Sequence, residues 1–249
     1  MNISNYLKKN KLKKITILLS FFIIFAISLN SVKDYGVSSD EYERRSLGFN
    51  NLNYIGEIFA SKLTEKFRLD KEYSNFKDYP LNYYGGAIID APLAFLEIIF
   101  KIEDKKNQFI FKHYVNNIFF FLSLIAFFKI INYRFLNWKF ALVGTVILFL
   151  SPRIFANSFY NNVDLLFMSF LLFTIYFGIK FLQRQNLKNI ILFAIFSAIA
   201  IGIRVMGILL PLVILSIFFL NSLIKKKIKF FFIKSFLFTI ITILFTILF

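Results

Sequence analysis

The sequence predicts an all-α fold: a polytopic helical bundle in a membrane, with a juxtamembrane amphipathic-helix loop after the first span. Of its 249 residues, 58% are hydrophobic, and most of these stand in long uninterrupted runs. Short stretches of lysine and arginine separate the runs, as they do in loops that flank membrane spans. A soluble domain of this length would not carry its apolar residues in such blocks.

The first apolar run, residues 15–29, follows a lysine-rich arm and is either a signal peptide or a first membrane helix. No convincing small-x-small cleavage site follows it, so we interpret it as a retained anchor. Residues 30–112 then form a predicted outer loop. Within that loop, apolar residues recur at helical spacing, which is typical of an amphipathic helix on the membrane surface. These residues are Leu52, Ile55, Phe59, Leu63 and Phe67.

Residues 83–100 are also apolar, but Asp90, Pro92 and Glu97 interrupt them. An acid at mid-membrane costs about 2.5–3.5 kcal/mol on insertion scales, so a juxtamembrane or re-entrant element is expected here. Five further runs are predicted to span: 114–131, 140–150, 163–181, 190–203 and 205–220. A last run, 230–249, is still apolar where the sequence stops, which is consistent with a fragment or a truncated form.

The loop charges predict the orientation. If residues 83–100 do not cross, the basic loops 133–139, 180–188 and 225–229 share the cytoplasmic side with the N-terminus. We therefore expect one transmembrane domain over residues 1–249, with the helical bundle at 113–249. The expected location is a bacterial inner (plasma) membrane, with the active site on the periplasmic or outer face.

Charge and residue content exclude several classes of function. The formal net charge is +16, but no sizeable soluble basic domain accompanies it, which argues against nucleic-acid binding. Because the chain has no cysteine, disulfides, thiolate metal sites and a cysteine nucleophile are excluded. His113 is the only histidine, and at the start of a span we interpret it as an interfacial residue. A zinc site is thus disfavoured, whereas a divalent metal on acidic ligands stays open and no cofactor is assigned.

The acidic residues are strongly asymmetric along the chain. Of 14, 13 lie between Asp34 and Asp104, and the other is Asp164, at the start of a span. Under the predicted topology every carboxylate faces one compartment. A lone acid entering an apolar helix indicates function, although Asp164 is equally suited to cap that helix.

Two further segments of the sequence contain candidate functional residues. Asp40 and Glu41 follow Ser38 and Ser39, which fits a helix start with Ser38, Ser39 or Asp40 as the N-cap. Such a start also holds a carboxylate rigidly, as general-base catalysis at an acceptor hydroxyl requires. Arg204 falls between two apolar runs, where phosphate is a natural partner for its guanidinium. The alternatives for this arginine are an ordinary loop cation or a structural pair with Asp164.

The order of five short motifs carries a resemblance to a known group. The motifs are Asp40-Glu41, Tyr83-Tyr84-Gly85-Gly86 through Pro92-Leu93, Ser151-Pro152-Arg153, Asn161-Asn162-Val163-Asp164 and Gly202-Ile203-Arg204. In this order the chain resembles the N-terminal part of the GT-C superfamily of membrane glycosyltransferases. Within it, the likeness is to the polyprenyl- or dolichyl-phosphate-sugar group of protein O-mannosyltransferases and aminoarabinose transferases. The paired prolines of that group, and a histidine that some members use as a metal ligand, are absent.

The resemblance implies a glycosyltransferase that moves a hexosyl or pentosyl group from a polyprenyl-phosphate donor to a hydroxyl on a lipid, glycan or protein. It implies that Asp40 is the general base of an inverting attack and that Glu41 orients Asp40 or the acceptor. Asp164 would line the same cavity, and Arg204 would neutralise the departing phosphate.

For the remaining candidates the resemblance implies less. Asp90 is expected to make a polar or metal contact, and Tyr83 and Tyr84 to lie on the substrate-binding side. Two other functions stay open: a transporter or flippase for a lipid-linked sugar, and a non-catalytic membrane subunit. A transporter would distribute its intramembrane charges along a pathway, whereas here the acids collect at one face. Besides substrates, the expected partners are membrane lipids and not nucleic acid.

Overall fold

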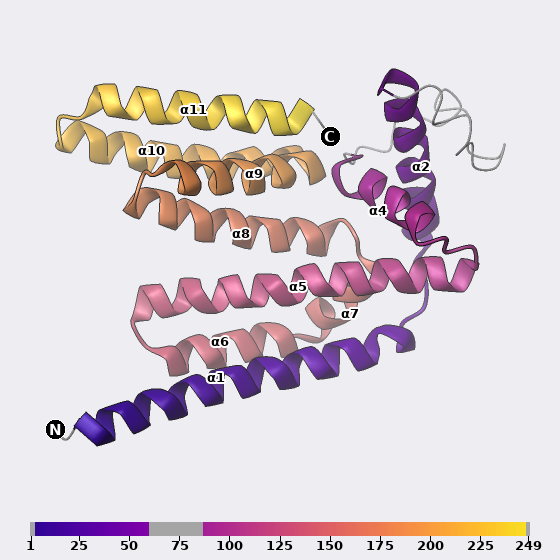
Figure 1. Ribbon diagram of the computed structural model, residues 1–249, viewed down its shortest axis with the longest axis horizontal. Helices are drawn as coiled ribbons and strands as arrows, with labels where there is room; N and C mark the ends of the chain where they lie inside the picture. The colour runs from indigo at the N-terminus through magenta and orange to yellow at the C-terminus, as the bar shows by residue number, and fades with distance from the viewer. Residues whose placement is uncertain (1–2, 60–86, 248–249) are drawn as a thin grey trace.

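The computed structural model describes residues 3–59 and 87–247, and all regular structure in these residues is helical, as predicted. The long helices run side by side in Figure 1. In chain order the elements are α1 Ile3–Ser31, η1 Val32–Asp34, α2 Ser39–Phe59, α4 Ala87–Ile99, α5 Lys105–Phe135, α6 Trp138–Leu150, α7 Pro152–Tyr160, α8 Asp164–Gln183, α9 Leu187–Ile203, η4 Val205–Ile208, α10 Leu209–Ile224 and α11 Ile228–Ile247.

Five helical segments in the described part of the chain are long and apolar enough to cross a membrane. They are Lys11–Asp34, α5, α8, Val205–Ile224 and α11. Helices α6 and α7 meet the same criterion together but are bent by 65°, and α9 is a shorter apolar helix. Helix α4, the described part of the interrupted run 83–100, is not among the spans. The prediction of an integral membrane helical bundle is therefore confirmed.

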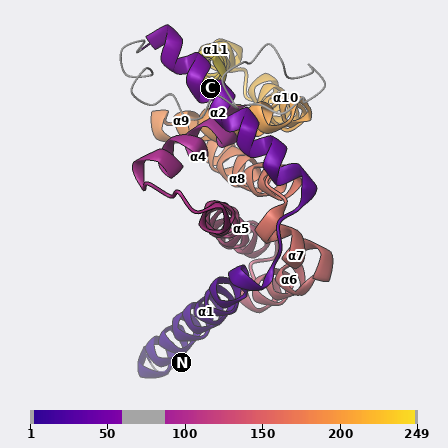
Figure 2. The ribbon, with the colours of Figure 1, turned by 90° about the vertical axis from the view of Figure 1, so that its right-hand side faces the viewer.

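The two ends of the bundle differ in character. The turns α5–α6, α8–α9 and α10–α11 all lie at one end, together with the N-terminus, and we call this the basic end (Figure 1). Helices α2 and α4 lie at the opposite end, the α2/α4 end. Figure 2 looks at that end and shows α2 and α4 crossing in front of the bundle, with α1 at one edge. The predicted basic loops thus share one end, as the topology requires.

Asparagine side chains begin two helices at the basic end. The Asn137 side chain accepts a hydrogen bond from the Lys139 backbone N–H at 3.0 Å and begins α6, and Asn186 caps α9 in the same way through Asn189. Before Asn137, Leu136 adopts a left-handed conformation and donates its N–H to the Asn132 carbonyl, which ends α5. The turns α5–α6 and α8–α9 are therefore short.

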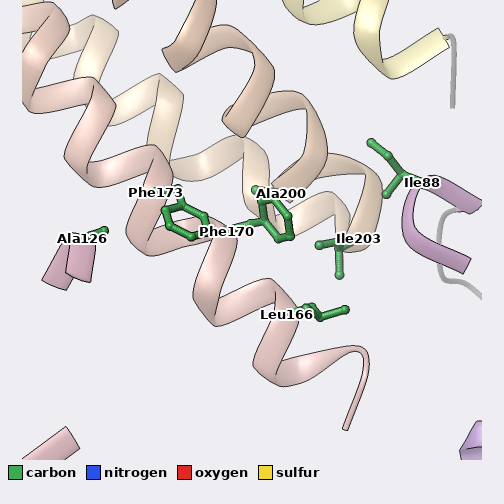
Figure 3. Close-up of a cluster of buried hydrophobic side chains, with 7 residues drawn as sticks. All are labelled: Ile88, Ala126, Leu166, Phe170, Phe173, Ala200 and Ile203. Carbon is green, nitrogen blue, oxygen red and sulfur yellow. The ribbon is translucent and has the colours of Figure 1, made fainter. Parts of the chain in front are cut away.

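Apolar packing attaches α4 to the bundle. Ile88 of α4 belongs to a buried cluster with residues of α5, α8 and α9 (Figure 3). The other members are Ala126, Leu166, Phe170, Phe173, Ala200 and Ile203. Helix α2 lies against α4 in turn, at Gly48, where a Cβ atom would stand 2.5 Å from the carbonyl oxygen of Asp90. Because Gly48 has no side chain, the backbones of α2 and α4 are able to approach closely. This close contact holds α2 at the α2/α4 end of the bundle.

Candidate functional site

The first turn of α2 presents Asp40 to solvent. Glu41 Oε2 accepts a hydrogen bond from the Ser38 backbone N–H at 3.2 Å, and the Glu41 N–H donates to the Ser38 carbonyl at 3.3 Å. This is the return half of a capping box, so Ser38 occupies the N-cap position. Asp40 is exposed and accepts from the Ser39 hydroxyl at 3.2 Å. At the start of a helix, its negative charge is favoured by the helix dipole.

Glu41 points the other way, into the protein. Its Oε1 lies 2.8 Å from His113 Nε2 on α5, and both side chains are only 1% exposed. The interpretation of His113 as an interfacial residue is therefore wrong. The sequence did contain a signal, because polar residues at 112, 113, 116 and 117 share one face of the helix at the start of the apolar run 114–131. All four are buried.

Asp90 is buried on α4 and connects two other elements. Its Oδ2 accepts from Arg44 Nη1 of α2 and its Oδ1 from Asn162 Nδ2 of the α7–α8 loop, each at 3.3 Å. Burial raises the pKa of the Asp90 carboxyl above its usual 3.8, against the opposing effect of the Arg44 guanidinium and the Lys112 ammonium. Both oxygens thus contact protein donors, and no group of three metal-ligating side chains is found in the described residues.

Other buried charges complete this region. Glu97 of α4 accepts from Arg45 of α2 through Nε at 2.9 Å and Nη2 at 2.7 Å. Lys112 of α5 is buried and interacts electrostatically with the carboxylates of Glu41, Asp90 and Glu97. We call the group formed by buried Glu41, Asp90, Glu97, Lys112 and His113 and half-buried Arg44 and Arg45 the polar junction. It balances three carboxylates with three cations where α2 and α4 meet α5, and buried charges require such pairing.

Asp164 does not cap α8. Instead the Asn161 side-chain oxygen accepts from the backbone N–H groups of Val163 and Asp164, at 3.2 and 2.8 Å. The Asp164 carboxylate is left to pair with Arg204 and to accept from Asn161 Nδ2 at 3.3 Å. The pair is open to solvent, with Asp164 58% and Arg204 45% exposed. Of the alternatives for Arg204, a pair with Asp164 is the one present.

Arg204 stands where the chain reverses. Its backbone is extended, with φ −146° and ψ 131°, so α9 ends at Ile203 and η4 begins one residue later. Gly207 follows closely, and a Cβ there would stand 2.6 Å from the Ala200 carbonyl oxygen. The turn is therefore tight, and it places the guanidinium at the end of α9 that faces α4.

The predicted residues come together through a chain of contacts. Arg44, one turn after Asp40, contacts Asp90, which contacts Asn162, two residues before Asp164, which pairs with Arg204. The structure thus joins the helix of Asp40 to Arg204. Tyr83 and Tyr84 lie outside the described residues.

Comparison with known proteins identifies the family. Residues 91–248 match the profile of the family described as dolichyl-phosphate-mannose-protein mannosyltransferase. The match includes Asp164 and Arg204 but begins after Asp40 and Glu41. No curated protein and no solved structure matches. The chain therefore belongs to the dolichyl-phosphate-mannose-protein mannosyltransferase family, and it is a membrane glycosyltransferase that uses a lipid-phosphate sugar donor.

Proposed function

We propose that the chain transfers a sugar from a polyprenyl-phosphate donor to an acceptor hydroxyl at the α2/α4 end, with inversion, and that Asp40 is the general base. One observation carries the proposal. Of the three acids Asp40, Glu41 and Asp90, only Asp40 is exposed, whereas the other two are buried with both oxygens hydrogen-bonded inside the protein. Asp40 therefore has a carboxylate to offer a substrate, on a helix start that is held rigidly.

In this reaction the Asp40 carboxylate takes the proton of the acceptor hydroxyl as its oxygen bonds to the anomeric carbon. The bond from that carbon to the phosphate oxygen breaks on the opposite face, and its electron pair leaves with the polyprenyl phosphate. Arg204 neutralises the charge that develops on this phosphate. Asp164 contacts Nη2 of the guanidinium, so the other donors of its planar fork are able to bind phosphate oxygens.

Glu41 and Asp90 have positioning roles in this proposal. Glu41 fixes the first turn of α2 to α5 through Ser38 and His113, and so holds the neighbouring Asp40. Asp90 ties α2 to the loop that precedes Asp164, and so keeps the base and the phosphate-binding arginine at a constant separation. Catalysis depends on such fixed geometry because a small displacement of reacting groups lowers the rate sharply.

The same end of the bundle is proposed to face the periplasm or cell exterior, with the N-terminus in the cytoplasm of a bacterial cell. The basic loops gather at the opposite end, and lysine- and arginine-rich loops are retained on the cytoplasmic side. The acids of the described residues all belong to segments at the α2/α4 end, which favours chemistry at one face over transport along a charged pathway.

The test is sugar transfer by the purified protein in liposomes, with labelled polyprenyl-phosphate mannose and a panel of peptide, lipid and glycan acceptors. Loss of a general base costs about 10²–10⁴ in rate, so we expect that reduction in kcat for Asp40→Asn with donor binding intact. Asp34→Asn is the matched control, because Asp34 is also exposed and lies just before α2.

Two further measurements make this test more specific. The product should have the anomeric configuration opposite to that of the donor, and Arg204→Ala should weaken donor binding. Full activity of Asp40→Asn, or retention of configuration, would contradict the assignment of Asp40 as the base.

A further inference from the structure

The basic end of the bundle contains a cavity of about 400 Å³ between α5 and α8. Polar side chains from the last turns of both helices line it. They are Lys129, Asn132, Tyr133, Tyr176, Lys180 and Gln183. Because this cavity lies at the opposite end from Asp40 and Arg204, it takes no part in the sugar-transfer site.

Two lysines from different helices converge on one aromatic ring here. Lys129 Nζ of α5 lies 5.3 Å from the centroid of the Tyr176 ring, and Lys180 Nζ of α8 lies 5.7 Å from it. A ring stabilises each ammonium through its quadrupole, but it does not neutralise the charge. Two like charges held together attract an anion between them.

In the described part of the chain, neither Lys129 nor Lys180 forms an ion pair with an acid. All 14 acids of the sequence lie between residues 34 and 104 or at Asp164. Asp164 begins α8 and Lys180 stands 16 residues later on the same helix, about 24 Å away at 1.5 Å per residue. The adjoining helix ends and turns at the basic end add further cations, Arg134, Lys139, Arg184 and Lys188. Among the residues that the structure describes, the two lysines that line the cavity therefore have no carboxylate partner.

The position of the cavity indicates the source of the anion. Lys129 and Lys180 lie about 9 Å and about 5 Å before the ends of two membrane-spanning helices, as measured along their axes. Tyr133 and Tyr176 accompany them, as aromatic residues do at membrane interfaces. This is the depth of lipid headgroups, and basic pockets between spans bind anionic headgroups.

We propose that this cavity binds the headgroup phosphate of an anionic glycerophospholipid, such as phosphatidylglycerol, in the leaflet at the basic end. Lys129 and Lys180 contact the phosphate oxygens, and Asn132 and Gln183 donate hydrogen bonds to the rest of the headgroup. The lipid occupies a different site, at the opposite membrane face, from the sugar donor.

The test is lipid binding by the whole chain in a neutral detergent, measured by native mass spectrometry with phosphatidylglycerol and phosphatidylcholine as probes. Each lysine near an anionic lipid contributes about fivefold, so Lys129→Gln with Lys180→Gln should weaken phosphatidylglycerol binding about thirtyfold. The control is Lys139→Gln with Lys188→Gln, which removes the same charge from exposed positions at the same end but outside the cavity. This control should bind phosphatidylglycerol like the wild type.

Two outcomes would overturn the proposal. Equal losses in the two double variants would show general electrostatic attraction without a site, as would equal binding of the two lipids by the wild type. Glycerol phosphate is added as a competitor to distinguish a lipid from a soluble anion. We expect no displacement by it, and displacement at low concentration would show that the cavity takes a soluble phosphate instead.

Discussion

Replacing Glu41 by glutamine tests the internal anchoring of the proposed base. The carboxylate accepts from the Ser38 N–H with one oxygen and contacts His113 Nε2 with the other. A glutamine keeps one acceptor oxygen and places an NH₂ group in the second position. If that group faces Ser38, two donors meet. If it faces His113, the imidazole must move its proton to Nδ1, which is buried and has no hydrogen-bond partner among the described residues.

Either arrangement leaves one buried donor unpaired, which costs about 1–3 kcal/mol. We therefore expect Glu41→Gln to lower the free energy of unfolding by about this amount, measured by circular dichroism during titration of the purified protein from mild detergent into dodecyl sulfate. Glu43→Gln, two residues along the same helix, should change the free energy by less than about 0.5 kcal/mol. In a double-mutant cycle with His113→Leu, the coupling energy should exceed about 0.5 kcal/mol, as for residues in contact.

The kinetic constants of the Glu41→Gln protein test whether Glu41 has a positioning role. Because we propose that Glu41 acts by positioning Asp40, its replacement should lower kcat for sugar transfer while the KM for the donor changes little. A Glu41→Gln protein with wild-type unfolding free energy would refute the hydrogen-bond argument. A changed donor KM with unchanged kcat would refute the positioning role.

Three further predictions concern the contacts around Asp90 and Arg204. Gly48→Ala should lower the free energy of unfolding by about 1–3 kcal/mol despite the better helix propensity of alanine, because the new Cβ would meet the Asp90 carbonyl at 2.5 Å. Gly36→Ala, with nothing within 4 Å, is its control. Because burial raises the Asp90 pKa in the folded protein, the wild type should lose stability relative to Asp90→Asn as the pH rises from 3.8 through the folded pKa, as measured in unfolding titrations at several pH values. A parallel pH dependence of the two proteins would contradict this. Arg204→Lys keeps the charge but not the planar fork, so the KM for the donor should rise in transfer assays, whereas an unchanged KM would argue against phosphate binding at Arg204.

The membrane fold was predictable because its signals are local. The length of each apolar run and the charge of each short loop are visible within about twenty residues of sequence. Each predicted run is helical over its described residues, but α6 is long enough to span only together with α7, and α9 is too short to count among the spans. The sequence also singled out Asp164 and Arg204 as candidate functional residues, because a charged residue at the edge of an apolar run is easily recognised. Their pairing was one of the alternatives that the sequence left open.

The polar junction was not predictable, because its contacts are distant in sequence. Glu41 and His113 are 72 residues apart, and Arg45 and Glu97 are 52 apart. Asp40 and Glu41 are neighbours, yet successive helical residues point in different directions, and only the packing of α2 on α5 decides which carboxylate is buried. The outer-loop helix was predicted from apolar residues at 52–67, whereas the described α2 begins earlier, at Ser39, and the residues after Phe59 lie outside the described ranges.

The shortness of α9 has a consequence for the membrane itself. Its 17 residues extend about 25 Å, less than the roughly 30 Å hydrocarbon core of a bilayer. A span that is too short is accommodated by thinning of the surrounding lipid, which draws the headgroup layer inward at its end. With α9 crossing the membrane, the bilayer surface around Arg204 should therefore be dimpled, which would bring water to the guanidinium, together with the donor phosphate that we propose it binds.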